Sequence, residues 1–513
     1  MRKPIPVHPF LFAAYPVLAL LGRNIVEVAP QASLRPLVLS ITAAGLVFLT
    51  LRLVLRDWAR AALVSTFLLA LFFSYGHVYA LLEAHLIAGF NLGRHRYLAV
   101  IYAVILLIGL WVLIWRSKQP TRTVLPLNLM GVVILLFPLY QIGAFYIRTA
   151  SQQEQVTQVL QTSAPALTAA LQPLPDVYYI VLDSHTRQDA LLEDFQFDNS
   201  PYLQEWEALG FYVADCARSN YGYTQASMVA ALNMDYLPAL GETLTATQEG
   251  GDIWVLLKHS RVRLQLEALG YQTVAFDSGY EWSRLTDADV YLSLGSESAA
   301  LQKITPFEAM LVKSTALLVL TDSQNQLLRS RFAELDFPYS FHVNSQRFIL
   351  DQLPSLADDP QPQFIFVHLL VPHVPFVFDA QGELVTDPAF YNGELSWPSD
   401  DQHRQQGYTN QVAFIDQAMT DIFRTILDGS TTPPIIVVHG DHGLLADNRY
   451  KILNAYYLPG DGAESLYPGI TPVNSFRVIF DAYFGARYGL THDTSYNETG
   501  QGVPETAPAC LQP

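Results

Sequence analysis

Five long runs without charged side chains dominate the first 150 residues. A helix that crosses the hydrocarbon core of a membrane needs about 20 mainly apolar residues. Each run approaches or exceeds that length once flanking arginines extend toward the interface. Arg2 and Lys3 precede the first run, as in a signal peptide, but the further runs favour a retained span. We therefore predict a five-helix transmembrane domain over residues 1–150, with spans at 4–22, 36–51, 61–82, 97–115 and 123–147.

The charges are distributed unequally along the chain. Residues 1–150 carry thirteen Lys/Arg and three Asp/Glu, a balance of +10. Since the whole chain has 30 basic and 47 acidic residues, the remainder holds 17 and 44, a balance of −27. Such an acidic part argues against nucleic acid as a partner, because binding it requires clustered basic side chains. No charged residue lies deep within a predicted span, which disfavours ion-coupled transport. The bundle is then an anchor, or a platform that presents a lipid substrate.

The topology follows from the flanking basic residues. An N-terminus inside the cell gives eight basic residues on the inner side and five on the outer side, as the positive-inside rule favours. An odd number of spans then places the rest of the chain outside. We predict a multi-pass protein of the plasma membrane with its second domain facing outward.

The exported part changes character near residue 175. A polar Gln/Ser/Ala-rich stretch at 151–175 indicates a juxtamembrane linker or helix. After it, short apolar runs alternate with amphipathic helices, a pattern typical of a mostly parallel sheet sandwiched by helices. We predict an α/β catalytic domain over 176–490 and a C-terminal tail over 491–513. The expected strands lie at 176–183, 272–279, 363–370 and 434–441, with helices at 252–269, 344–356 and 407–427.

Acidic and histidine side chains follow three of the predicted strands. Asp183 ends the first, His373 follows the third, and Asp441 and His442 follow the fourth. Each has a simpler explanation alone, as a turn or an exposed loop residue. Together they meet at the edge of a parallel sheet where ligands bind, and Asp with His suits Zn²⁺ or Mn²⁺. His368 and His439 lie inside apolar strands and are interpreted mainly as structural.

Two hydroxyl groups occur at the start of a predicted helix near residue 226. Thr224 and Ser227 are three residues apart, and capping the helix needs only one of them. The free backbone N–H groups at a helix start stabilise an anion, and a nearby metal lowers the pKa of a hydroxyl. One of the two is therefore a candidate nucleophile.

At this point the chain resembles the alkaline phosphatase superfamily. The resemblance lies in its sulfatase-like branch, which includes lipoteichoic acid synthase and the lipid A phosphoethanolamine transferases. It covers about 176–445 and rests on VYYIVLDSH, the Thr-x-x-Ser of Thr224 and Ser227, HLLVPHVPF, YTNQVAFIDQAM and GDHG, in that order. Those transferases also resemble this chain in having five spans before an outward catalytic domain.

The resemblance implies a role for each matching residue. Thr224 corresponds to the nucleophile, which is also a metal ligand, and His373 to the residue that contacts the transferred group or protonates the leaving oxygen. Ser227 corresponds to the serine after the nucleophile and is a substrate-binding candidate. One divalent cation is implied, Mn²⁺ or Zn²⁺, with Ca²⁺ and Mg²⁺ as alternatives. The implied metal ligands are Asp183, Thr224, Asp441 and His442.

Departures from the family pattern favour transfer of phosphate groups over hydrolysis of sulfate esters. Sulfatases carry Cys or Ser in C-x-P-x-R, whereas Thr224 is followed by neither Pro nor Arg at those positions. Ser184 follows Asp183 where many sulfatases have a second aspartate, and Leu444 replaces the usual Glu. We predict a membrane enzyme that transfers a phosphoglycerol- or phosphoethanolamine-type head group through a phosphothreonine, acting on a membrane lipid or envelope glycan.

Two other functions stay open. One is a phosphodiesterase, phosphatase or sulfuric ester hydrolase acting on exported substrates, and the other is a catalytically silent binding protein. The two cysteines, Cys216 and Cys510, both lie in the exported part. They are able to pair there, although their spacing alone does not establish a disulfide.

Overall fold

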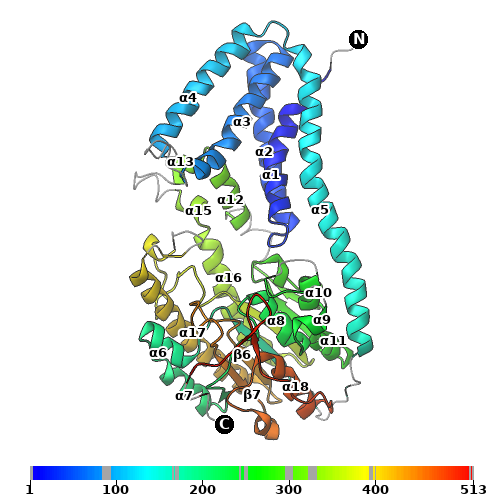
Figure 1. Ribbon diagram of the computed structural model, residues 1–513, viewed down its shortest axis with the longest axis vertical. Coiled ribbons are helices and arrows are strands. Elements are labelled where there is room, and N and C mark those ends of the chain that lie inside the picture. Colours follow the sequence, from blue (N-terminus) through cyan, green and yellow to red (C-terminus); the bar gives the residue numbers. More distant parts are fainter. Residues whose placement is uncertain are drawn as a thin grey trace. The chain divides into compact units, whose positions relative to one another are not determined.

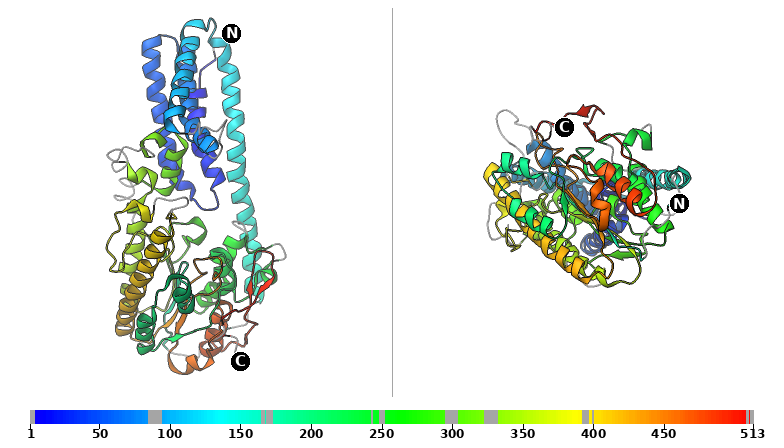
Figure 2. Two further views of the ribbon diagram at one scale, coloured as in Figure 1. Left: turned by 60° about the vertical axis from the view of Figure 1, so that its left-hand side comes forward. Right: turned by 90° about the horizontal axis from the view of Figure 1, so that it is seen from below.

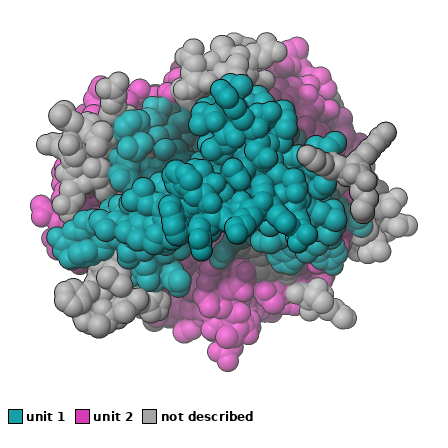
Figure 3. Space-filling model, turned by 90° about the horizontal axis from the view of Figure 1, so that it is seen from above, with its two compact units in different colours: residues 1–147, 297–341 teal, residues 148–296, 342–513 magenta. Residues whose placement is uncertain are grey.

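The protein divides into two compact units, which Figure 3 shows in teal and magenta. The computed structural model describes residues 4–83, 94–163, 167, 173–241, 244–247, 252–294, 304–321, 332–391, 397–398, 400–507 and 510. Unit 1 comprises Met1–Ile147 and Glu297–Phe341, and unit 2 comprises Arg148–Ser296 and His342–Pro513.

Long apolar helices form most of unit 1 (Figure 1). Among the described residues, four helices are long and apolar enough to cross a membrane: Pro30–Leu55, Trp58–Glu83, His95–Arg116 and Thr121–Ala150. The first predicted span corresponds to the shorter helix α1, which has 16 residues, so the number of five spans stays a prediction. The helices are α1 (His8–Arg23), α2 (Leu34–Leu55), α3 (Trp58–Glu83), α4 (His95–Trp111) and α5 (Thr121–Ser163).

Small side chains occupy many of the buried positions between these helices. Ala13, Ala44, Ala61 and Ala62 are fully buried. In membrane bundles such residues allow helix backbones to approach closely, because lipid supplies no hydrophobic force that would drive larger side chains inward. Helix α5 remains helical to Ser163, so the first part of the predicted linker at 151–175 is a helix.

The predicted catalytic domain at 176–490 is not one compact unit. Residues 297–341 belong to unit 1. They contain α12 (Pro306–Ser314), α13 (Leu318–Thr321) and α15 (Ala333–Asp336). The physical reason is apolar packing, since Phe307 of α12 shares a buried cluster with Val17 and Leu21 of α1.

Unit 2 contains a seven-stranded sheet in the order β2-β7-β6-β1-β5-β3-β4. From β6 to β4 all neighbouring strands are parallel, whereas β7 runs antiparallel to both β6 and β2. The mostly parallel sheet and the four predicted strands are therefore confirmed. The strands are β1 (Val177–Leu182), β2 (Tyr212–Val213), β3 (Gln272–Phe276), β4 (Val290–Leu292), β5 (Gln363–Leu369), β6 (Ile435–His439) and β7 (Asn454–Tyr457).

Helices lie on both sides of this sheet (Figures 1 and 2). On one side α7 (Ser200–Ala208) packs against α17 (Asp401–Gly429), with Trp206 against Phe423. On the other, α18 (Pro472–Tyr483) packs against α8 (Thr224–Asn233). The helix predicted at 252–269 is two, α10 (Asp252–Lys258) and α11 (Arg261–Ala268), because Ser260 caps the second one. The remaining helices are α6 (Gln188–Phe195), α9 (Leu237–Leu240) and α16 (Tyr339–Gln352).

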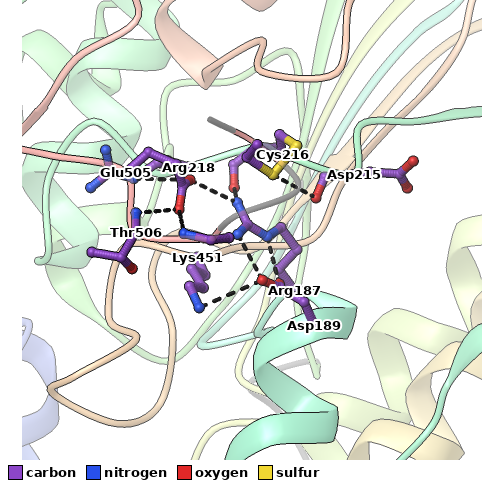
Figure 4. Close-up of a disulfide and its surroundings, with 11 residues drawn as sticks. Arg187, Asp189, Asp215, Cys216, Arg218, Lys451, Glu505 and Thr506 are labelled. Carbon is purple, nitrogen blue, oxygen red and sulfur yellow. Dashed lines mark hydrogen bonds and ion pairs between the residues drawn. A yellow bond between two sulfur atoms is a disulfide. The ribbon is translucent and has the colours of Figure 1, made fainter. Parts of the chain in front are cut away.

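The predicted C-terminal tail at 491–513 is folded against unit 2. It forms β8 (Ser495–Tyr496) and β9 (Gly502–Val503), and Cys510 forms a disulfide with Cys216. Beside the disulfide, Glu505 pairs with the buried Arg187 at 3.3 Å (Figure 4). The disulfide thus attaches the last part of the chain to the loop before α8, and the ion pair attaches it to the residue before α6.

Candidate metal centre and nucleophile

The loops after β1, β5 and β6 are joined at the edge of the sheet by their backbones. The backbone N–H of Asp183 donates to the carbonyl of Leu369, and that of His373 donates to the carbonyl of Asp183 at 3.0 Å. Gly440 approaches the first of these loops so closely that a Cβ would overlap the carbonyl oxygen of His185. The side chains that follow the three strands are brought together in this way.

Asp183, Asp441 and His442 form a compact ligand set. One ligand atom from each lies within 4.8 Å of the others, and all three residues are buried. Nδ1 of His442 donates to the carbonyl of Gly443 at 3.0 Å, so Nε2 is the nitrogen whose lone pair faces the other ligand atoms. In the part of the chain that the structure describes, the buried Oδ2 of Asp441 has no hydrogen-bond partner. Three potential ligand atoms therefore lie close enough together to hold one cation.

Ser184 contacts all three members of this set, whereas sequence reasoning treated it only as a departure from the family pattern. Its backbone N–H donates to Oδ1 of Asp441 at 2.8 Å. Its hydroxyl donates to Oδ1 of Asp183 at 3.1 Å and accepts from Nδ1 of His442 at 3.2 Å. The residue has φ +62°, in the left-handed region, which costs a non-glycine residue energy and often marks a functional constraint.

Thr224 is the first residue of α8, and its hydroxyl lies beside the ligand set. Oγ1 of Thr224 is 3.3 Å from Nε2 of His442. No side chain caps this helix, and Tyr223 occupies the N-cap position. Capping therefore does not explain Thr224. Its hydroxyl lies at the helix end where free backbone N–H groups and the helix dipole stabilise negative charge.

The other two predicted site residues lie in different surroundings. The Ser227 side chain is fully buried, and in the described part of the chain its hydroxyl has no partner. Its contact with substrate stays a prediction. His373 is half-buried, and its ring centroid lies 6.4 Å from that of His442. Its Nδ1 donates to the carbonyl of Val374 at 2.7 Å, so Nε2 is the nitrogen available to a substrate.

The two strand histidines differ in their partners. His439 donates from Nδ1 to the carbonyl of Gly440 at 2.8 Å and accepts from the Tyr179 hydroxyl at 2.9 Å, as a structural residue would. Nε2 of His368 lies 3.4 Å from Oδ2 of Asp183, and within the described residues neither ring nitrogen meets hydrogen-bond geometry. Its position in an apolar strand concealed this proximity to Asp183.

Arg449 supplies a positive charge next to the candidate nucleophile. Its Nε donates to the carbonyl of Gly222, and its Cζ lies 5.3 Å from the centre of the Tyr223 ring. Its charge contributes to lowering the pKa of His442. Among the described residues, nothing accepts a hydrogen bond from its two terminal nitrogens. Arg449 is therefore a candidate to bind an anionic substrate, and sequence reasoning missed it.

Electrostatics hold both kinds of ligand in the form that binds a metal. Burial by itself raises the pKa of Asp183, but the neighbouring His373, His368 and His442 lower it well below its usual range. Burial lowers the pKa of His442, although Asp441 acts in the opposite direction. Cations bind deprotonated carboxylate and neutral imidazole. The residues present therefore fit a divalent cation.

Comparison with known proteins agrees with this geometry. The sulfatase family model matches residues 175–477, well over half of the chain. The protein belongs to the sulfatase family. This confirms the predicted family and enzyme class, a hydrolase or transferase of phosphate or sulfate esters. A comparison with curated proteins found no match.

Several solved structures are similar to this chain at low identity. The C-terminal periplasmic domain of EcEptC from Escherichia coli, in complex with zinc, shares 13% identity over 61% of this chain and 84% of that one, with a TM-score of 0.38. The integral membrane lipooligosaccharide phosphoethanolamine transferase A from Neisseria meningitidis shares 11% over 90% and 88%, with a TM-score of 0.36. The phosphonate monoester hydrolase of Agrobacterium radiobacter shares 14% over 60% and 73%, with a TM-score of 0.37.

Proposed function

We propose that this protein is a metal-dependent membrane enzyme that transfers a phospho-head-group through a phosphothreonine at Thr224. The observation that carries the proposal is the 3.3 Å distance between the Thr224 hydroxyl and Nε2 of His442. This distance places a hydroxyl with no capping role beside three converging ligand atoms. A nucleophile adjacent to a bound cation is what covalent phosphoryl transfer requires.

Asp183, Asp441 and His442 would hold the cation, with Thr224 as its fourth neighbour. We expect Mn²⁺ or Zn²⁺, which both accept carboxylate and imidazole ligands. When bound, the cation lowers the pKa of the Thr224 hydroxyl and offsets negative charge on the phosphoryl oxygens. Three protein ligands and an open position are typical of catalytic rather than structural sites.

The chain's own residues account for the bond changes. The Thr224 hydroxyl first loses its proton to water, and the resulting alkoxide forms a bond to phosphorus while the bond between phosphorus and the lipid alcohol breaks. His373 gives a proton from Nε2 to that leaving oxygen. It then takes a proton from an acceptor alcohol, whose oxygen attacks the phosphothreonine and releases Thr224. The Arg449 guanidinium binds a nonbridging oxygen and favours the charged transition state.

The proposed donor is a lipid head group on the outer side of the membrane, consistent with a catalytic domain attached to apolar helices. A head group of phosphoglycerol or phosphoethanolamine type carries the phosphodiester that this chemistry requires. Water in place of the acceptor alcohol would make the protein a phosphodiesterase. In sulfatases the Cys or Ser of the C-x-P-x-R signature is converted to formylglycine, which attacks the sulfate ester. A threonine is not converted in this way, so hydrolysis of sulfate esters through formylglycine is disfavoured.

Replacement of Thr224 by alanine tests the proposal. We expect turnover of a phosphodiester lipid to fall by at least about 1000-fold, because the nucleophile is lost. Bound metal should remain, because three ligands are untouched. Thr224→Ser should keep part of the activity, and Ser227→Ala should keep most of it if Ser227 is not the nucleophile. Full turnover in Thr224→Ala would rule out the assignment.

A further inference from the structure

An apolar segment, residues 304–320, lies in the sequence between two parts of unit 2. Residues 304–320 contain only two charged side chains, Glu308 and Lys313. Seventeen residues with a helix-starting Pro306 are too short to span a membrane, and such segments are usually buried or interfacial. In this protein, the segment packs inside unit 1.

Apolar side chains of α12 complete a core at one end of the helix bundle. Phe307 is 1% exposed and clusters with Val17, Leu21 and Ile25. Met310 and Leu311 pack against the same cluster, together with Ile142 and Phe145 of α5. The segment therefore takes part in the core of unit 1.

Glu308 fixes the orientation of α12 by polar contacts. Its carboxylate accepts from Nε of Arg35 at 2.5 Å and from a second nitrogen of the same guanidinium. The carboxylate also accepts from the backbone N–H of Thr305, whose hydroxyl accepts from the backbone N–H of Glu308, a capping box. A bidentate pair and a helix cap thus share one carboxylate, which is a specific arrangement.

The backbones of α12 and of the turn that follows it lie in direct contact with α3. The backbone N–H of Ala316 donates to the carbonyl of Phe72 at 2.8 Å. A Cβ at Gly76 would overlap the carbonyl oxygen of Lys313. The absence of a side chain at Gly76 makes this approach feasible, as at other close helix crossings in membranes.

All these contacts lie at one end of the bundle. They involve the last parts of α1 and α3, the first turn of α2, and the last part of the apolar stretch Thr121–Ala150 within α5. Successive helices alternate in direction, so these parts share the end at which α5 leads into the exported part of the chain. Under the predicted topology this is the outer surface of the membrane.

We propose that residues 304–321 are a second membrane attachment of the exported part. They bind the outer end of the helix bundle and hold residues 173–513 on the membrane independently of the α5 connection. This role does not depend on the catalytic proposal. The partner of residues 304–321 is the helix bundle of the same chain. They bind it through a buried apolar face and through the carboxylate of Glu308.

The test uses the full-length protein in membranes, with a recognition sequence for a site-specific protease inserted after Gln172. After cleavage and a high-salt wash, which screens exposed charges, we expect fragment 173–513 to stay in the membrane pellet. Release of this fragment from the otherwise unchanged protein would overturn the proposal.

Matched variants identify the contact that retains the fragment. Gly76→Val displaces α12 and should release the cleaved fragment into the supernatant, while the uncleaved protein stays in the pellet. Gly143→Val is the control, since a Cβ at Gly143 on α5 meets nothing within 4 Å. Retention of the Gly76→Val fragment would show that another surface holds it, contrary to the proposal.

A charge exchange supplies an independent check if the Gly76 variant does not fold. Glu308→Arg places two like charges together and should release the cleaved fragment. Arg35→Glu combined with Glu308→Arg restores the pair with reversed charges and should restore retention. Equal release from the single and the double variant would contradict the role of this ion pair.

Discussion

The two units differ in where they place their large apolar side chains. In unit 1 many of them are exposed, such as Leu53 at 78% and Ile147 at 74%. In unit 2 most of them are buried, as in strand β1, whose six residues are all fully buried. The first arrangement suits lipid, and the second suits water. Residues 304–321 belong to unit 1, although the sequence on either side of 297–341 belongs to unit 2. Their large apolar side chains are buried or half-buried, so the difference teaches that this segment is covered by the helix bundle and not by the sheet domain.

The largest expected effect comes from loss of a metal ligand in unit 2. Asp441→Asn keeps an oxygen that accepts from Ser184 but removes the charge facing His442. We expect metal affinity to fall by more than about 100-fold. This exceeds the effect of replacing a residue that only supports the ligands, which is about 10–100-fold. Metal analysis of the purified protein measures this. The hydrogen exchange of unit 1 should be unchanged. Altered exchange protection of its helices would show that the two units are not independent.

Removal of the disulfide should weaken unit 2 alone. Cys216 and Cys510 are 294 residues apart, and removing a native disulfide costs about 2–5 kcal/mol of folding free energy. In the double replacement by serine, hydrogen exchange should accelerate in β1 and β6 but not in α2 or α3. Faster exchange in both units would show that their stabilities are coupled.

Ser184 tests how the ligand set is positioned. Ser184→Ala removes the hydroxyl that joins Asp183 to His442 and should lower metal affinity by about 10–100-fold. Ser184→Gly removes the same hydroxyl and relieves the left-handed backbone, so it should be more stable than alanine by about 1 kcal/mol. Calorimetric metal titration and denaturation separate the two effects. Unchanged affinity in both variants would exclude this positioning role.

The smallest effect concerns pH and a carboxyl group at the start of β1. Burial raises the pKa of Asp176 to about 6 from an ordinary value of 3.8. The folded state therefore retains a proton that the unfolded state releases between about pH 4 and pH 6, and stability falls as the pH rises through this range. Asp176→Asn lacks this titration and can still accept from the backbone of Gln363. Its stability relative to the unchanged protein should increase across that range and then level off, as pH-dependent denaturation would show.

Much of the architecture was predictable from patterns of apolar residues. The four strands appear in the sequence as short apolar runs, and the membrane helices appear as long apolar runs. Asp183, Asp441 and His442 were predictable as neighbours because parallel strands present their carboxyl ends at one edge. The family match confirms the enzyme class, whereas the role of each site residue stays a proposal.

Other features depend on contacts that sequence position does not reveal. Ser184 contacts the ligand set through a left-handed backbone, and Arg449 reaches Tyr223 from a loop 226 residues away along the chain. The apolar segment at 304–320 was visible in the sequence, but its partner was not. An apolar helix has the same composition whether it packs within its own domain or against a helix bundle.

The most direct test of the central claim is mass spectrometry of the protein after incubation with membrane lipids and the metal. The account predicts a phospho-head-group attached to the peptide that contains Thr224, and its absence in Thr224→Ala or after metal removal. Turnover without an adduct at Thr224 in rapidly quenched samples, or an adduct on another residue, would contradict it.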